Sequence, residues 1–175
     1  MLQFAEWLQA TPFSVAIQSA GWAIPLIQSI HILMIGVVFV SILMIALRVL
    51  ELVRVEQTFG DVWRRFAPWI WSGLVVMAVT GLLLVIAEPV REFTSLSFWL
   101  KMALIVVGIV GTIAFRRSLA PAALTQHHEF EFSAATKAGA VATLGLWLAI
   151  IFLGRAIAYD VEVWGSLSLV ASFAG

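Results

Sequence analysis

His31 is the residue of this sequence best placed to do chemistry, because it lies inside a long apolar run. The run is PLIQSIHILMIGVVFVSILMIAL, residues 25–47. An imidazole there loses its hydrogen bonds to water and needs a partner within the protein. Ionisable side chains inside membrane-spanning segments are rare and commonly functional. We therefore expect His31 either to bind a ligand or to hydrogen-bond a neighbouring helix.

The spacing around His31 suits two kinds of metal chemistry. Gln28, His31 and Met34 are three residues apart, so they share one face of a helix. An imidazole nitrogen and a thioether suit Cu(I), which makes His31 and Met34 candidate metal ligands. Haem ligation by His31 is the other interpretation. The remaining histidines, His127 and His128, are expected roughly 20 Å away across the membrane, too far to share a haem with His31.

Other ionisable residues are expected at the depth of His31. Glu88 ends the second apolar stretch, Lys101 lies a turn into the third, and Arg155 lies near the end of the fourth. In helix bundles, cofactor sites are formed by side chains that facing helices place at the same depth. Lys101 and Arg155 would then neutralise the negative charge of haem propionates or of a quinone oxygen, and Glu88 would tune these two cations. In the plainer interpretation the two cations extend to the membrane interface and Glu88 pairs with Lys101.

Composition identifies the class of protein. The chain is 62% hydrophobic and 11% charged, whereas a soluble domain has about 25% charged residues. It is therefore expected to be an integral membrane protein. A net charge of zero leaves no basic surface for nucleic acid. The absence of cysteine excludes disulfides, thiolate metal sites and cysteine-held iron–sulfur clusters.

Four apolar stretches are long enough to cross a bilayer, since about 20 residues span its ~30 Å core. They are residues 25–50, 68–87, 98–115 and 138–158, with Pro25 and Pro68 expected in first helical turns. Residues 1–22 and 161–175 are predicted to lie in the membrane interface. The predicted fold is all-α: a four-transmembrane-helix bundle, one domain of residues 1–175, with N- and C-terminal interfacial segments.

The distribution of Lys and Arg predicts the orientation of the bundle. Seven such residues fall on one side and three on the other, which places both termini on the periplasmic side of a bacterial inner membrane. The seven are Arg48, Arg54, Arg64, Arg65, Arg116, Arg117 and Lys137; the three are Arg91, Lys101 and Arg155. Small residues on the third and fourth stretches allow close packing within the bundle or a homo-oligomer.

Three segments carry a family resemblance: SIHILMIGVVFVSILMIALRVLEL, APWIWSGLVVMAVTGLLLVIAEP and FWLKMALIVVG. They resemble an uncharacterised family of small bacterial four-helix membrane proteins, over about residues 22–117. More distantly, the layout is similar to the membrane domain of copper-resistance protein D and to the four-helix bacterial protoporphyrinogen oxidase. The matching positions are His31, Arg48, Thr80-Gly81, Phe98 and Lys101.

In the oxidase, the histidine and lysine positions are associated with haem or tetrapyrrole binding, so the resemblance implies such a role for His31 and Lys101. The chain also departs from that pattern. The oxidase has a histidine near the end of its third helix, where this chain has TIAFRRS. Cytochromes of the b561 type need paired histidines on facing helices, which this chain lacks.

These observations favour a small inner-membrane protein that binds a redox cofactor, haem b or a quinone, in the outer half of the bundle. The predicted cofactor-binding residues are His31, Lys101, Arg155, Glu88 and Gln28. One alternative is a non-catalytic accessory subunit of a larger membrane complex, and another is copper handling through His31 and Met34. Whether the protein is an enzyme stays open.

Overall fold

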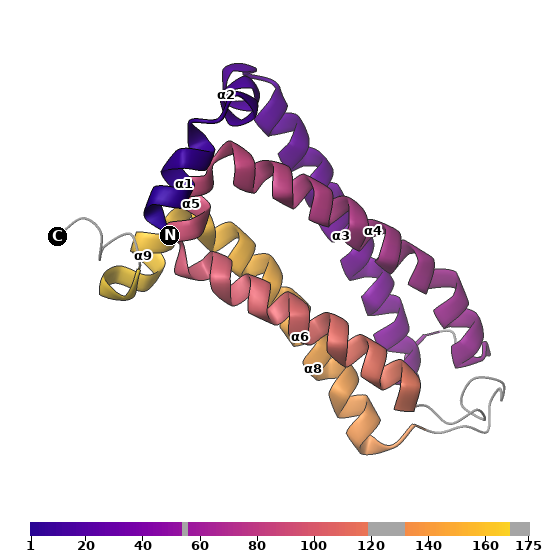
Figure 1. Cartoon of the computed structure of the whole chain (residues 1–175). Helices are drawn as coiled ribbons and strands as arrows, with labels where there is room; N and C mark the ends of the chain where they lie inside the picture. The colour runs from indigo at the N-terminus through magenta and orange to yellow at the C-terminus, as the bar shows by residue number, and fades with distance from the viewer. Residues whose placement is uncertain (54–55, 119–131, 169–175) are drawn as a thin grey trace.

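The computed structural model describes residues 1–53, 56–118 and 132–168, and their regular structure is entirely helical (Figure 1). Four helices are long: α3 (Ala23–Val49), α4 (Phe59–Ala87), α6 (Leu96–Ser118) and α8 (Ala134–Ala156). Each is long and apolar enough to cross a membrane. The predicted all-α fold with four candidate spans is therefore confirmed.

The long helices form two pairs, α3 with α4 and α6 with α8 (Figure 1). α3 also packs along α8, so it joins the two pairs. α4 makes no comparable contact with α6 in the described part of the chain, and Figure 1 shows these two helices apart. Many large apolar side chains on the outside of the helices are exposed, Val75 and Phe152 among them. Lipid covers such surfaces in a bilayer.

Short helices gather at the end of the bundle where α3 begins and α4 ends, which we call the His31 end (Figure 1). They are α1 (Leu2–Gln9), α2 (Pro12–Ser19), α5 (Pro89–Thr94), η1 (Ile157–Tyr159), α9 (Asp160–Trp164) and η2 (Gly165–Leu167). Phe4 of α1 packs edge-on against Phe93 of α5, with 5.9 Å between ring centres. Ser14 Oγ of α2 donates a hydrogen bond to the Ile86 carbonyl at 2.7 Å. The N-terminal helices are thus bound to α4 and α5; residues 169–175 lie outside the described residues.

α4 begins at Phe59, so the expectation that Pro68 lies in the first turn of its helix is wrong. The Thr58 hydroxyl accepts a hydrogen bond from the Asp61 amide at 3.0 Å and donates to the Asp61 carboxylate at 2.7 Å. This cap starts the helix at Thr58. Phe59 and Val62 are fully buried, so their packing also stabilises the first turn of the helix. Pro68 is accommodated inside the helix. The bounds of the other long helices differ from prediction by at most four residues.

The opposite end of the bundle, which we call the Arg48 end, is joined by polar contacts that α3 and the turn after it make with the segment before α4 and with the start of α8. Buried Arg48 donates through Nε to the Gln57 carbonyl at 2.9 Å. Glu51 has a φ of 60°, in the left-handed region that few non-glycine residues adopt. Its carboxylate accepts hydrogen bonds from Lys137 Nζ at 2.8 Å and from the Phe132 amide at 3.3 Å. These contacts hold the chain reversal after α3 against the start of α8.

Candidate functional site

α4 lies close to α3 because it has glycines where α3 passes. A Cβ added at Gly81 would be 3.4 Å from His31 Cε1, at the limit of ordinary van der Waals contact. At Gly73 it would be only 2.5 Å from Val38 Cγ2. Small residues allow such close approach of membrane helices. The backbone of α4 at Gly81 can therefore face the imidazole of His31 directly.

A hydrogen bond joins the imidazole of His31 on α3 to Thr80 on α4. Nδ1 lies 2.8 Å from Thr80 Oγ1. The Thr80 hydroxyl has one hydrogen, which it donates to the Val76 carbonyl at 2.8 Å. When that hydrogen goes to Val76, Thr80 accepts from His31, and the neutral imidazole then carries its proton on Nδ1. In that tautomer Nε2 keeps its lone pair; Nε2 makes no hydrogen bond with the described residues.

Lys101 brings a positive charge to the same region. Its charge interacts with His31 on α3 and with Glu92 on α5. Nζ lies 5.7 Å from the centre of the Phe98 ring, a cation–π distance. Within the described residues Lys101 has no salt bridge and no hydrogen bond. A half-buried ammonium without a close anion suits an anionic group on a ligand.

The two acidic residues near Lys101 have different roles. Glu88 pairs with Arg91 rather than with Lys101, contrary to the plainer interpretation, because Pro89 starts a short helix that places Arg91 beside Glu88. Glu92, which no sequence pattern singles out, is buried, and its carboxylate lies 3.7 Å from the guanidinium of Arg91. Burial raises the pKa of Glu92, and the charges of Lys101 and Arg91 oppose this rise only in part.

The raised pKa of Glu92 predicts that the contribution of this group to stability decreases as the pH increases. The folded state holds the Glu92 proton more tightly than the unfolded chain, whose glutamate has a pKa near 4.5. Stability from this group is therefore greatest below pH 4.5 and falls as the pH rises through the folded pKa. Each tenfold difference in proton affinity between the folded and unfolded states changes the free energy of unfolding by about 1.4 kcal/mol.

Thermal unfolding in detergent between pH 4 and 8 measures this dependence, and Glu92→Gln should remove the decrease that comes from Glu92. Glu162→Gln, at an exposed position of α9, is the matched control and should leave the slope unchanged. Equal slopes for the wild type and Glu92→Gln would contradict the assignment.

The other predicted site residues lie around this group with less contact. Gln28 is half-buried one turn before His31, and its amide makes no hydrogen bond with the described residues. Met34 is half-buried one turn after His31. Arg155 is exposed and interacts with Tyr159, donating to its hydroxyl at 3.2 Å. The structure thus brings together His31, Lys101 and the Thr80-Gly81 pair, whereas Arg155 is bound elsewhere.

His31 supplies a single nitrogen ligand. The described residues contain no group of three or more His, Cys, Asp or Glu side chains that could hold a metal ion. His127 and His128 lie outside the described residues. A site with one free imidazole nitrogen and one free ammonium suits a metal that arrives with its other ligands in place, as in haem, better than a bare ion.

Asp160 positions the helix that carries Lys101, although it is 59 residues further along the chain. Its buried carboxylate accepts hydrogen bonds from the amides of Leu96 and Ser97, at 3.3 and 3.0 Å. These are the first two amides of α6, which have no partner within the helix. Ser95 Oγ accepts from the third, the Phe98 amide, at 3.2 Å. Asp160 therefore acts as an N-terminal cap for α6.

Four apolar helices, with a half-buried histidine and lysine at one end, define a small multi-pass membrane protein whose helices contact the lipid bilayer. Residues 4–160 match the model of a family of unknown function (DUF6644), and the chain belongs to this family. No curated protein and no solved structure matches the chain. The expected membership of a family of small multi-pass membrane proteins is confirmed at this level.

Proposed function

We propose that this chain is a small redox protein that binds haem, or a closely related metallated tetrapyrrole, at the His31 end of the bundle. The observation that carries the proposal is the hydrogen bond from His31 Nδ1 to Thr80, which leaves Nε2 free. Histidine ligands of metals commonly donate their other ring N–H to a fixed acceptor, which sets the tautomer and orients the ring. Thr80 is such an acceptor.

Lys101 supports the same proposal from the neighbouring helix. Haem carries propionate groups, and the ammonium of Lys101 has no close anion in the described residues. An ammonium and a carboxylate form a charge-assisted hydrogen bond, about twice as strong as a neutral one. When bound, the tetrapyrrole would supply one-electron transfer. The protein would orient the ring through His31 and neutralise one propionate through Lys101.

The tautomer of His31 favours a metal ligand over a quinone. A quinone oxygen needs a hydrogen-bond donor. Nε2 without a proton can only accept, so the two cannot form a hydrogen bond. A quinone at this site would have to bind through Lys101 or Gln28 instead. Nε2 with a free lone pair is suited to coordinate iron directly.

The distribution of Lys and Arg supports a location in the bacterial inner membrane with both termini on the periplasmic side. The His31 end, where the N-terminal helices lie, would then face the periplasm (Figure 1). Because the chain has no cysteine, a single cysteine introduced at Glu6 gives a clean test. It should react with a membrane-impermeant thiol reagent in whole spheroplasts; protection there and reaction only in inverted vesicles would contradict the orientation.

An absorption spectrum tests the cofactor. The full chain, purified after expression with a haem precursor, should show a Soret band that is lost in His31→Ala. Met34→Leu is the matched control, because it changes the same helix face one turn away, and it should keep the band. Circular dichroism verifies that both variants remain helical.

Two results would overturn the proposal. A helical wild-type protein that stays colourless when haem is added would favour the accessory subunit. Copper at one equivalent in metal analysis, lost in both His31→Ala and Met34→Leu, would favour copper handling instead.

A further inference from the structure

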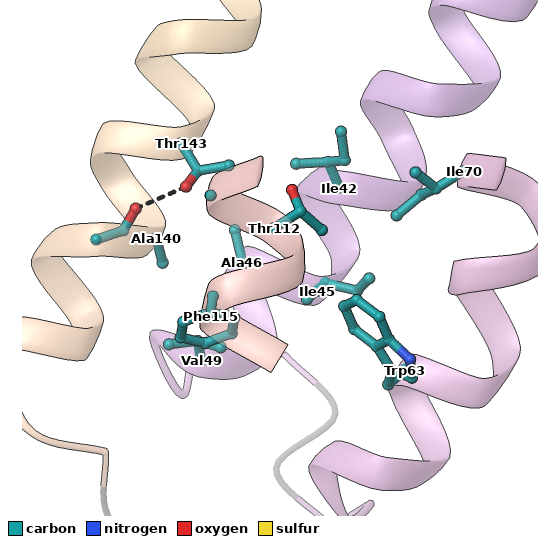
Figure 2. Close-up of a pocket in the computed structure, with 12 residues that line it drawn as sticks. Ile42, Ile45, Ala46, Val49, Trp63, Ile70, Thr112, Phe115, Ala140 and Thr143 are labelled. Carbon is teal, nitrogen blue, oxygen red and sulfur yellow. Dashed lines mark hydrogen bonds between the residues drawn. The ribbon is translucent and has the colours of Figure 1, made fainter. Parts of the chain in front are cut away.

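A cavity of about 210 Å³ lies among the four long helices in the half of the bundle nearer the Arg48 end (Figure 2). All four helices contribute to its wall, for example Ile45 from α3, Trp63 from α4, Phe115 from α6 and Thr143 from α8. The cavity is separate from the candidate site, because neither His31 nor Lys101 lines it.

The wall of the cavity offers few polar groups. Thr112 donates its hydroxyl hydrogen to the Gly108 carbonyl at 2.7 Å, and Thr143 donates to the Gly139 carbonyl at 2.8 Å. Neither hydroxyl hydrogen is free for a ligand. A Cβ added at Gly111 or at Gly139 would meet no atom within 4 Å, so both glycines leave open space. The interior therefore suits a hydrocarbon.

The cavity is partly open, and its wall includes residues of α4 and α6, the two spans that do not pack extensively on each other. In a bilayer, a gap between two spans faces the acyl chains of the lipid. An engineered cavity of 150 Å³ with an apolar lining binds benzene, whereas pockets for drug-sized ligands begin near about 300 Å³. A volume of about 210 Å³ therefore suits part of a flexible chain better than a large ring system.

A cation lies next to the residues of the cavity wall. Arg116 follows Phe115 in the last turn of α6, and its guanidinium carbon is 5.7 Å from the centre of the Trp63 ring. Both Phe115 and Trp63 line the cavity. Arg116 has no carboxylate partner among the described residues. Guanidinium groups bind phosphate oxygens through two parallel hydrogen bonds.

We propose that the cavity binds one acyl chain of an anionic phospholipid whose phosphate lies on Arg116. The chain enters between α4 and α6 and fills the space beside Gly111 and Gly139. The charge on Arg116 selects an anionic headgroup. This site does not depend on the cofactor proposed for His31.

The experiment uses the full chain, stripped of lipid in detergent and titrated with phosphatidylglycerol or phosphatidylcholine, with native mass spectrometry as the readout. The wild type should retain one phosphatidylglycerol in preference to phosphatidylcholine. Arg116→Gln should weaken phosphatidylglycerol binding about fivefold. One basic residue contributes roughly 1 kcal/mol near an anionic lipid surface, which corresponds to about a fivefold change in Kd. Arg117→Gln, at the exposed neighbouring position, should leave binding unchanged.

A second pair of variants tests the acyl-chain part. Gly139→Leu places a side chain in the cavity and should reduce lipid retention at least tenfold. Gly145→Leu is the matched control, because Gly145 is on the same helix, also meets no atom within 4 Å and does not line the cavity. Equal retention of the two lipids by the wild type would overturn the proposal, as would equal effects of Arg116→Gln and Arg117→Gln. Displacement of the lipid by a neutral quinone or alkane at equal concentration would assign the cavity to that occupant.

Discussion

Replacing Asp160 with asparagine is expected to lower the free energy of unfolding by about 3 kcal/mol. The carboxylate is buried and accepts four hydrogen bonds, two on each oxygen. One oxygen accepts from Ser95 and Ser97, and the other accepts from Leu96 and Ser168. An amide of the same shape has one acceptor oxygen, and its NH₂ group would face two donors. Leaving buried donors unpaired costs about 1–3 kcal/mol each.

Thermal or denaturant unfolding in detergent micelles, followed by circular dichroism, measures this loss. Glu162→Gln is the control, because Glu162 is an exposed acid on the same short helix, and it should change stability by less than about 0.5 kcal/mol. If the two variants unfolded alike, Asp160 would not be the cap of α6.

The same variant should also affect the candidate site. Ser97, which donates to Asp160, is one helical turn before Lys101. Fraying of the first turn of α6 therefore releases the helix segment that holds Lys101 beside His31. Weaker cofactor binding in Asp160→Asn, with the Soret band still present, is the expected result.

Replacing Thr80 with valine is expected to weaken haem binding 10- to 100-fold, the range found when the hydrogen-bond partner of a metal-ligating histidine is removed. Valine has the shape of threonine, so packing against His31 is preserved, but the acceptor for Nδ1–H is lost. The imidazole can then rotate or change tautomer. Titration of the purified apoprotein with haem, followed at the Soret band, gives the affinity.

Thr80→Ser keeps the acceptor oxygen and should bind haem within about threefold of the wild type, which separates the hydrogen bond from the packing. A readout without cofactor is also available, since ¹⁵N chemical shifts of the His31 ring distinguish the two neutral tautomers. The apoprotein should have the proton on Nδ1, and Thr80→Val should shift the population toward Nε2–H. Haem affinity equal to that of the wild type in Thr80→Val would show that Thr80 does not position His31.

Much of the fold could be predicted from local sequence. A helix that crosses a bilayer needs a continuous apolar run, and that requirement identified all four long helices. The start of α4 cannot be predicted from apolar content alone, because it depends on a cap at Thr58 and on burial of Phe59 and Val62. The sequence signal for this start is Thr58 followed three residues later by Asp61, a pattern typical of a capping threonine just before a helix.

The candidate site could be predicted only in part. His31 stands out as the one histidine in an apolar run, and Lys101 as a cation just inside another. Their partners depend on how each helix is rotated about its axis, which sequence spacing within one helix does not determine. Glu88 was expected to meet Lys101, yet it pairs with Arg91, and buried Glu92 interacts with Lys101 instead. Arg155, one residue after the glycine that packs on Lys101, lies beside Tyr159.

By itself, then, the sequence determined that this is a multi-pass membrane protein of four helices with an imidazole inside its first span. These properties follow from composition and from the length of each apolar run. Only the tertiary structure decided that Thr80 is the hydrogen-bond partner of His31, that Asp160 caps α6 from the far end of the chain, and that an apolar cavity lies beside Arg116. Such contacts join separate helices, and their packing depends on every interface at once, so no single segment encodes them.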